Sequence, residues 1–212
     1  MTRTESMSLT TSTVDTVLFD IGNVLVGWDP YAPYTARMPD LDVDSFFAET
    51  GFLSLNHRAD AGERWASLVA EVAAASPHHA AAAQLYVDHY ADALTGPVPG
   101  SAAVVEELRA AGVRLFGLSN FSAELFHHAE PAAPAIGLLE DVLISGEVRL
   151  AKPDPAIFQL ARERFGLDPA RTVFVDDMPA NVAAAAALGF DAIRFTDADR
   201  LRRDLRARGL PL

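Results

Sequence analysis

The sequence has no cysteine among its 212 residues. This absence excludes disulfide bonds, thiolate nucleophiles and zinc sites built on cysteine. It fits a reducing compartment, and we expect a cytoplasmic protein. Long apolar runs are also missing, since none approaches the roughly 18 residues that a transmembrane helix requires. The first 13 residues are rich in serine and threonine without an apolar centre, so we predict no signal peptide.

Positive charge is scarce in this sequence. Lysine and arginine number 17 against 29 aspartates and glutamates, which gives a net charge of −12. Such a charge opposes binding to nucleic acid or to an anionic membrane surface, and we expect neither as a partner. Half of the residues are apolar, which is typical of a globular protein of one or two domains. The sequence makes no prediction about the oligomeric state.

Short apolar runs bounded by glycine, proline or asparagine predict the strands of a parallel sheet covered on both faces. They lie at residues 14–20, 113–119 and 172–176, with a weaker run at 191–195. Helical patterns follow them, beginning at Ser101, at Asp154-Pro155 and at Pro179. Strands that alternate with helices indicate an α/β fold with a Rossmann-like core.

More than 90 residues separate the first predicted strand from the second, which is too many for a simple crossover. Trp65, Leu68, Val69 and Val72 recur at helical spacing within this stretch. We therefore predict a helical cap domain at residues 28–96, inserted after the first strand into a core of residues 14–27 and 97–212. A lid over a site at the edge of the sheet is a natural role for such an insertion.

Small polar or acidic residues follow three of the predicted strands. Asp20 ends the first, Ser119 and Asn120 end the second, and Asp176 and Asp177 end the third. Ligands of open parallel sheets bind beyond the carboxyl ends of the strands. The sequence therefore predicts a functional site where these side chains gather.

Four motifs in this order resemble those of the haloacid dehalogenase-like (HAD) hydrolase superfamily. They are VLFDIGNVL with Asp20, LSN with Ser119, LAKPDPAIF with Lys152, and FVDDMPANV with Asp176 and Asp177. The resemblance extends over nearly the whole chain and includes the helical cap. It implies Mg²⁺-dependent hydrolysis of a small phosphorylated metabolite through an aspartyl-phosphate intermediate.

The resemblance also implies a role for each motif residue. Asp20 would be the nucleophile, because a carboxylate attacks phosphorus without first losing a proton. The metal would be held by Asp20, Asp177 and the main-chain carbonyl of Gly22, and Asp176 would hold its water shell or the lysine. Lys152, Ser119 and the backbone amide of Asn120 would bind the phosphate oxygens, and Lys152 would stabilise the developing charge.

Gly22 departs from the phosphatase pattern of this superfamily. Most such phosphatases carry a second aspartate at that place, which protonates the leaving group and later activates water. General acid–base catalysis contributes about 10²- to 10⁴-fold, so we expect substrates with good leaving groups. The segment FDIGNVLV is similar to that of bacterial phosphatases of small sugar phosphates, and Asp29 is a candidate for the missing acid.

Two alternatives compete with the phosphatase interpretation. The 2-haloacid dehalogenases of the superfamily also lack the second aspartate, use no metal and attack carbon. However, without a metal the adjacent carboxylates Asp176 and Asp177 would repel an anionic haloacid. A catalytically weak binding or regulatory protein is the other alternative.

The positions of the six histidines do not indicate a metal site. His78-His79 and His127-His128 are adjacent pairs, and adjacent side chains diverge on an α-helix. We therefore expect no histidine metal site.

Overall fold

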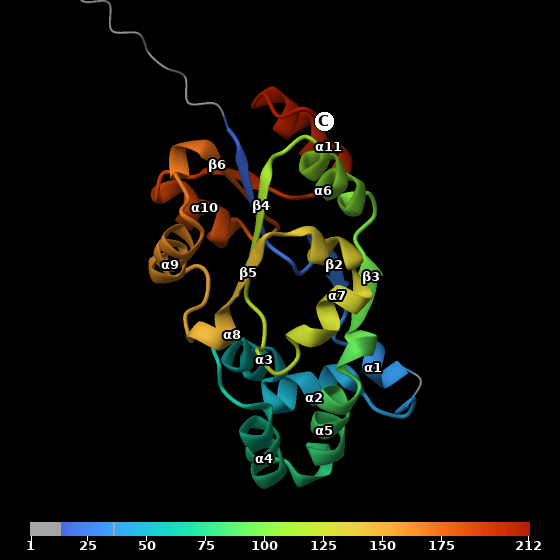
Figure 1. Cartoon of the computed structure of the whole chain (residues 1–212). Helices are drawn as coiled ribbons and strands as arrows, with labels where there is room; N and C mark the ends of the chain where they lie inside the picture. The colour runs from blue at the N-terminus through green and yellow to red at the C-terminus, as the bar shows by residue number, and fades with distance from the viewer. Residues whose placement is uncertain (1–13, 36) are drawn as a thin grey trace, which may run out of the picture.

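A computed structural model describes residues 14–35 and 37–212, so the N-terminal segment considered above for a signal peptide lies outside the described residues. Its core is a parallel sheet of five strands in the order β5-β4-β1-β6-β7 (Figure 1). The bounds are Thr16–Phe19 for β1, Arg114–Ser119 for β4, Asp141–Ile144 for β5, Thr172–Asp176 for β6 and Asp191–Arg194 for β7. The predicted α/β fold is confirmed, although β5 was not foreseen.

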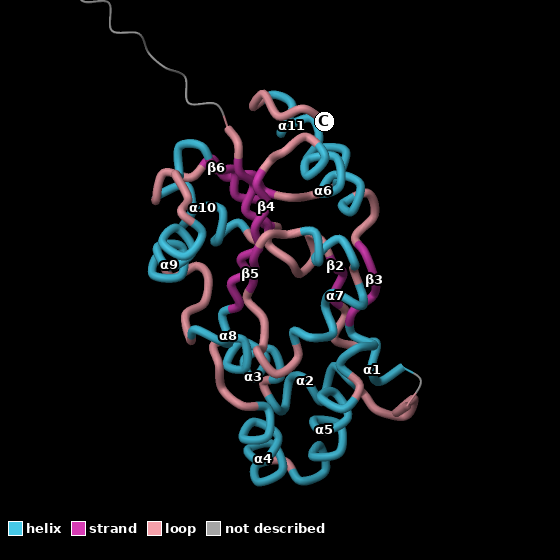
Figure 2. Tube along the Cα trace, viewed as in Figure 1, coloured by secondary structure: helices cyan, strands magenta, loops and turns pink. Residues whose placement is uncertain are grey.

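Helices cover both faces of this sheet. On one face, α9 (Pro155–Phe165) and α10 (Pro179–Ala187) pack over Leu18, Phe116 and Phe174. On the other face, α6 (Ser101–Ala110) and α11 (Ala198–Ala207) pack over Val17 and Val173 (Figure 2). The strands are buried on both sides, which explains why they appear in the sequence as continuous apolar runs.

The helix boundaries follow local capping chemistry. The side chain of Asp154 accepts the N–H of Ala156 at the start of α9, as predicted, and Gly166 ends that helix with φ 62°. The N-cap predicted at Ser101 is wrong. Gly100 holds that position with φ 80°, and Ser101 is the first helical residue with a buried hydroxyl.

The segment between β2 (Val26–Trp28) and β3 (Leu94–Pro97) is helical. It contains α1 (Ala32–Thr35), α2 (Val43–Thr50), α3 (Phe52–Asp60), α4 (Trp65–Ala75), α5 (Ala80–Asp88), and the 3₁₀ helices η1 (Pro77–His79) and η2 (Tyr90–Ala93). Their core is aromatic. Phe52 packs edge-on against Tyr86 with ring centroids 4.7 Å apart, and Trp65 lies 5.4 Å from Tyr86.

The chain enters and leaves this helical segment through one antiparallel pair, β2 with β3, in which Gly27 faces Gly96. A Cβ atom on Gly27 would lie 2.3 Å from Thr95 Oγ1, so a larger residue there would require the Thr95 side chain to move. The pair therefore sits at the boundary that the sequence predicted for the cap.

The remaining short elements lie after β4 and around β6. They are η3 (Phe126–His128), α7 (Ala129–Ala132), η4 (Pro134–Leu138), α8 (Ser145–Val148) and η5 (Pro169–Arg171). Within the described residues, no helix combines the length and the apolar character needed to cross a bilayer.

Candidate active site

The topology of the sheet brings the three predicted strand ends together. Strand β1 lies between β4 and β6, and Phe19 is paired with Gly117 on one side and Val175 on the other. Asp20 continues this register, since its N–H donates to Val175 O at 2.8 Å. The side chains that follow the three strands therefore meet at one edge of the sheet, as predicted.

Lys152 joins two of these strand ends from the loop before α9. Its ammonium lies 2.8 Å from Asp20 Oδ1 and 2.7 Å from Asp176 Oδ2, and it donates to Leu118 O at 2.7 Å. The side chain of Asn120 holds the Lys152 backbone through two hydrogen bonds of 2.8 Å, one to its N–H and one to its carbonyl. The side chain of Asn120 therefore orients the lysine, and the contact of its backbone amide with the phosphate stays a prediction.

Asp176 is fully occupied by contacts from the protein. Its Oδ1 accepts the N–H of Met178 at 2.8 Å and the Asn181 amide at 3.0 Å, while its Oδ2 receives Lys152. Of the two roles foreseen for Asp176, these contacts fit that of holding the lysine. The sequence analysis did not predict the role of Asn181, because nothing in the sequence marks this asparagine as the partner of a buried carboxylate.

Burial dominates the electrostatics of this cluster. It raises the pKa of Asp20 to about 7, although the positive charge of Lys152 opposes the change. Burial alone would lower the pKa of Lys152, but Asp20 and Asp176 outweigh it, and the pKa is raised. The pKa of Asp177 is raised by burial and by the charge of Asp176. Lys152 thus stays charged between two carboxylates.

Two further predicted residues lie at this edge. The hydroxyl of Ser119 is buried and has no hydrogen-bond partner within the described chain. An unpaired buried hydroxyl costs about 1–3 kcal/mol, so an acceptor from a bound ligand would stabilise it. Gly22 follows Asp20 at the wall of the cleft, and a Cβ atom on it would meet no atom within 4 Å.

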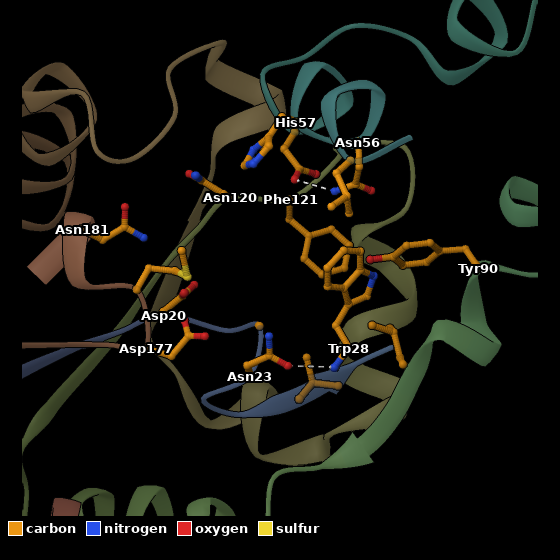
Figure 3. A pocket seen from close by; sticks show the side chains of 16 residues that line it. Asp20, Asn23, Trp28, Asn56, His57, Tyr90, Asn120, Phe121, Asp177 and Asn181 are labelled. Atoms are coloured by element: carbon orange, nitrogen blue, oxygen red, sulfur yellow. Dashed lines mark hydrogen bonds between the residues drawn. The ribbon is translucent and has the colours of Figure 1, made fainter. Parts of the chain in front are cut away.

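A cleft of about 280 Å³ opens between this edge and the helical insertion (Figure 3). The polar groups on the side of the strand ends are Asp20, Asn23, Asn120, Asp177 and Asn181. The opposite wall is apolar and largely aromatic, and it is built by Val26, Trp28, Leu53, Tyr90, Leu94 and Phe121. Trp28 is fixed there by a hydrogen bond of 3.1 Å from its Nε1 to the Tyr86 hydroxyl.

Helix α3 contributes Asn56, His57 and Asp60 to the cleft. Asp60 accepts the Asn56 amide at 3.0 Å and the backbone N–H of Ser122, and burial raises its pKa to about 7. The sequence did not single out Asp60, because no motif marks it. Asp29, the acid suggested from the sequence, is exposed, accepts the N–H of Tyr31 and does not line the cleft.

The raised pKa of Asp60 predicts how stability depends on pH. In the unfolded chain an aspartate titrates near pH 3.9, so between that pH and about 7 the folded state holds a proton that the unfolded state has lost. The stabilisation from this proton is complete below pH 3.9 and is lost as the pH rises through 7. The wild type should therefore lose about 1–2 kcal/mol of unfolding free energy between about pH 5.5 and pH 8.5 that Asp60→Asn does not lose.

Urea unfolding at these two pH values measures this difference. The control is Asp29→Asn, which removes an exposed carboxylate from the neighbourhood of the cleft. Parallel stability curves for Asp60→Asn and the wild type would contradict the prediction.

Known proteins resemble this chain in sequence and in fold. (S)-2-haloacid dehalogenase 4A of Burkholderia cepacia is 31% identical over 45% of this chain, but the match spans only 42% of that relative. Sesquiterpene phosphatase astK of Aspergillus oryzae is 23% identical over 88% of this chain and 92% of its own. A HAD-family enzyme of Bacteroides thetaiotaomicron, solved with magnesium and inorganic phosphate, superposes with a TM-score of 0.65 at 18% identity, covering 87% of this chain and 95% of its own.

The motif residues and the strand ends described above all fall within one family match. Residues 14–189 fit the model of the haloacid dehalogenase-like hydrolases. The chain belongs to this family of hydrolases.

Proposed function

We propose that the protein hydrolyses a small phosphate monoester through an aspartyl-phosphate intermediate on Asp20, with Mg²⁺ as cofactor. The observation that supports the proposal most directly is the convergence of Asp20 and Asp177 from adjacent strand ends on one side of a cleft, with Lys152 in contact with Asp20 beneath them. The magnesium and phosphate bound by the relative from Bacteroides thetaiotaomicron, and the phosphatase activity in the name of the relative from Aspergillus oryzae, support it.

The donor set fits Mg²⁺. Carboxylate oxygens of Asp20, Asp176 and Asp177 lie within 4.8 Å of one another, and hard oxygen ligands are what this ion prefers. The contacts of Asp176 with the protein leave Asp20 and Asp177 as the carboxylates for the metal, and Gly22, which lines the cleft with them, would offer its carbonyl. When bound, Mg²⁺ would neutralise the repulsion between the carboxylate and the phosphate.

Asp20 is oriented for attack by its own contacts. Its Oδ1 accepts the N–H of Ile21 at 2.7 Å and contacts Lys152, whereas its Oδ2 has no hydrogen bond from the described chain. Oδ2 would form the bond to phosphorus while the ester P–O bond breaks, and the leaving oxygen would take a proton from water. Water would then attack phosphorus, release phosphate and return the Asp20 carboxylate. Lys152 and the Ser119 hydroxyl would stabilise the phosphoryl oxygens.

The walls of the cleft favour a neutral leaving group with an apolar face. Trp28, Tyr90 and Phe121 offer ring surfaces, and no lysine or arginine lines the cleft in the part of the chain that is described. A second phosphate or a carboxylate on the substrate would meet Asp60 and Asp177 rather than a positive charge. This disfavours a bisphosphate or a phosphate ester that also carries a carboxylate. A sugar phosphate, as inferred from the resemblance, would instead rely on Asn56, His57 and Asp60 of α3 to bind its hydroxyl groups.

A panel of substrates tests the proposal. We expect phosphate release from aryl and alkyl monophosphates that stops when Mg²⁺ is removed with a chelator. The kcat/KM for these esters should exceed that for hexose 1- and 6-phosphates at least about tenfold, since one apolar group matched to its pocket contributes 1–3 kcal/mol. Halide release from 2-chloropropionate without metal would establish the dehalogenase instead. Tight binding of a phosphate ester without any turnover would establish a binding protein.

A further inference from the structure

A second group of metal-ligating side chains lies in the helical insertion, on residues that do not line the cleft. Glu49 of α2 meets His78 and His79 of η1. The Nε2 atom of His79 lies 3.0 Å from Glu49 Oε2, and that of His78 lies 3.2 Å from the same oxygen. The three donor atoms all lie within 4.8 Å of one another. Two imidazoles thus converge on one carboxylate oxygen.

This convergence corrects the expectation that adjacent histidines diverge. Pro77 begins a 3₁₀ helix rather than an α-helix, and the two rings lie 4.0 Å apart at 42°. His79 is buried and packs on Phe46, one turn before Glu49 on α2, with ring centroids 5.2 Å apart. The His79 ring is therefore held in place by packing, which lowers the entropic cost of binding a metal.

We propose that Glu49, His78 and His79 form a binding site for a divalent transition metal of the Zn²⁺ type. Two imidazole nitrogens and one carboxylate oxygen are ligands that this class of ion prefers, whereas Mg²⁺ takes oxygen ligands only. Ligand atoms about 2.0 Å from a tetrahedral ion are about 3.3 Å apart, close to the two nitrogen–oxygen separations found here. Glu49 and His78 are exposed, so the fourth position opens to water.

A metal bound by Glu49, His78 and His79 would cross-link two parts of the helical insertion. Glu49 is near the end of α2, and η1 connects α4 to α5, so a bound ion would join the two halves of the insertion. Gly51 links α2 directly to α3, which carries the cleft residues Asn56 and His57. The bound metal would therefore hold the wall of the cleft in place from outside.

Calorimetric titration of untagged, chelator-treated full-length protein with Zn²⁺, in excess Mg²⁺, tests this site. We expect a single Zn²⁺ to bind, and binding to weaken at least about 100-fold in both Glu49→Gln and His78→Ala. Co²⁺ in place of Zn²⁺ should give the intense visible absorption of a tetrahedral site. Zn²⁺ should also raise the melting temperature of the wild type but not of these variants, because it binds only the folded state.

Two control variants separate this site from other places where Zn²⁺ can bind. His127→Ala alters the other adjacent pair, whose rings are 3.9 Å apart but belong to no metal-ligating group among the described residues. Asp177→Asn alters the carboxylates at the strand ends. Both should keep the affinity of the wild type. Unchanged Zn²⁺ affinity in Glu49→Gln and His78→Ala, or a loss of binding in Asp177→Asn alone, would overturn the proposal.

Discussion

Replacing Asp20 with asparagine should lower the kcat/KM for a phosphate monoester by about 10⁴-fold or more, the size of loss seen when a nucleophile is removed. An amide oxygen does not form the acyl-phosphate bond that a carboxylate forms. The fold should survive, because asparagine can still accept the N–H of Ile21 and the ammonium of Lys152 through its amide oxygen. Steady-state assays beside thermal unfolding measure both effects.

The same variant separates a nucleophilic role from a purely electrostatic one. In the wild type, acid quenching during turnover should trap phosphate covalently bound to the protein, and Asp20→Asn should show none. Asp29→Asn is the matched control, since it removes an exposed carboxylate of the same type outside the cleft. Residual activity within tenfold of the wild type would show that Asp20 is not the nucleophile.

Introducing an aspartate at Gly22 should raise the turnover of esters with poor leaving groups by about 10²-fold, the lower end of what acid–base catalysis contributes. The backbone can accept a side chain there, because a Cβ atom would meet no atom within 4 Å and Gly22 is not in the left-handed region. The new carboxyl would line the cleft near Asp20 and Asp177, whose negative charges would raise its pKa and favour its role as an acid.

Gly22→Asn is the control for this gain, because its side chain has the same shape but does not donate a proton as an acid does. Rates for a series of phenyl phosphates with leaving groups of different pKa give the readout. Dependence of the rate on that pKa should be steep in the wild type and in Gly22→Asn, and shallow in Gly22→Asp. Equal slopes in all three proteins would show that another group already supplies the proton.

The strands that carry the motifs could be predicted from the sequence because burial on both faces makes them continuous apolar runs. Residues 172–176 were predicted to the residue, and the strand predicted at 14–20 is shorter in the structure, Thr16–Phe19. Strand β5 was missed because its apolar run, residues 142–144, is very short and lies between polar residues. Short apolar runs of this kind do not distinguish a strand from a buried loop.

The cleft could be predicted only on its core side. The strand ends follow from topology, so Asp20, Ser119 and Asp176 could be grouped before their contacts were known, whereas Lys152 was added only through the family resemblance. Which cap side chains face them depends on how the helices pack. Trp28 and Asp60 reach the cleft for that reason, and periodicity along the sequence does not encode it. The roles of Gly22 and Asp177 at a metal stay predictions.

The pairing of Gly27 with Gly96 places the two ends of the helical insertion side by side, and this closeness has an evolutionary consequence. Because the polypeptide departs from the sheet and returns to it at neighbouring points, a tight hairpin could bridge the gap, or a different set of helices could be spliced in. Neither exchange would shift the register of β1 against β4 and β6. The hydrolytic chemistry and the selection of its substrates can thus diversify as separate modules.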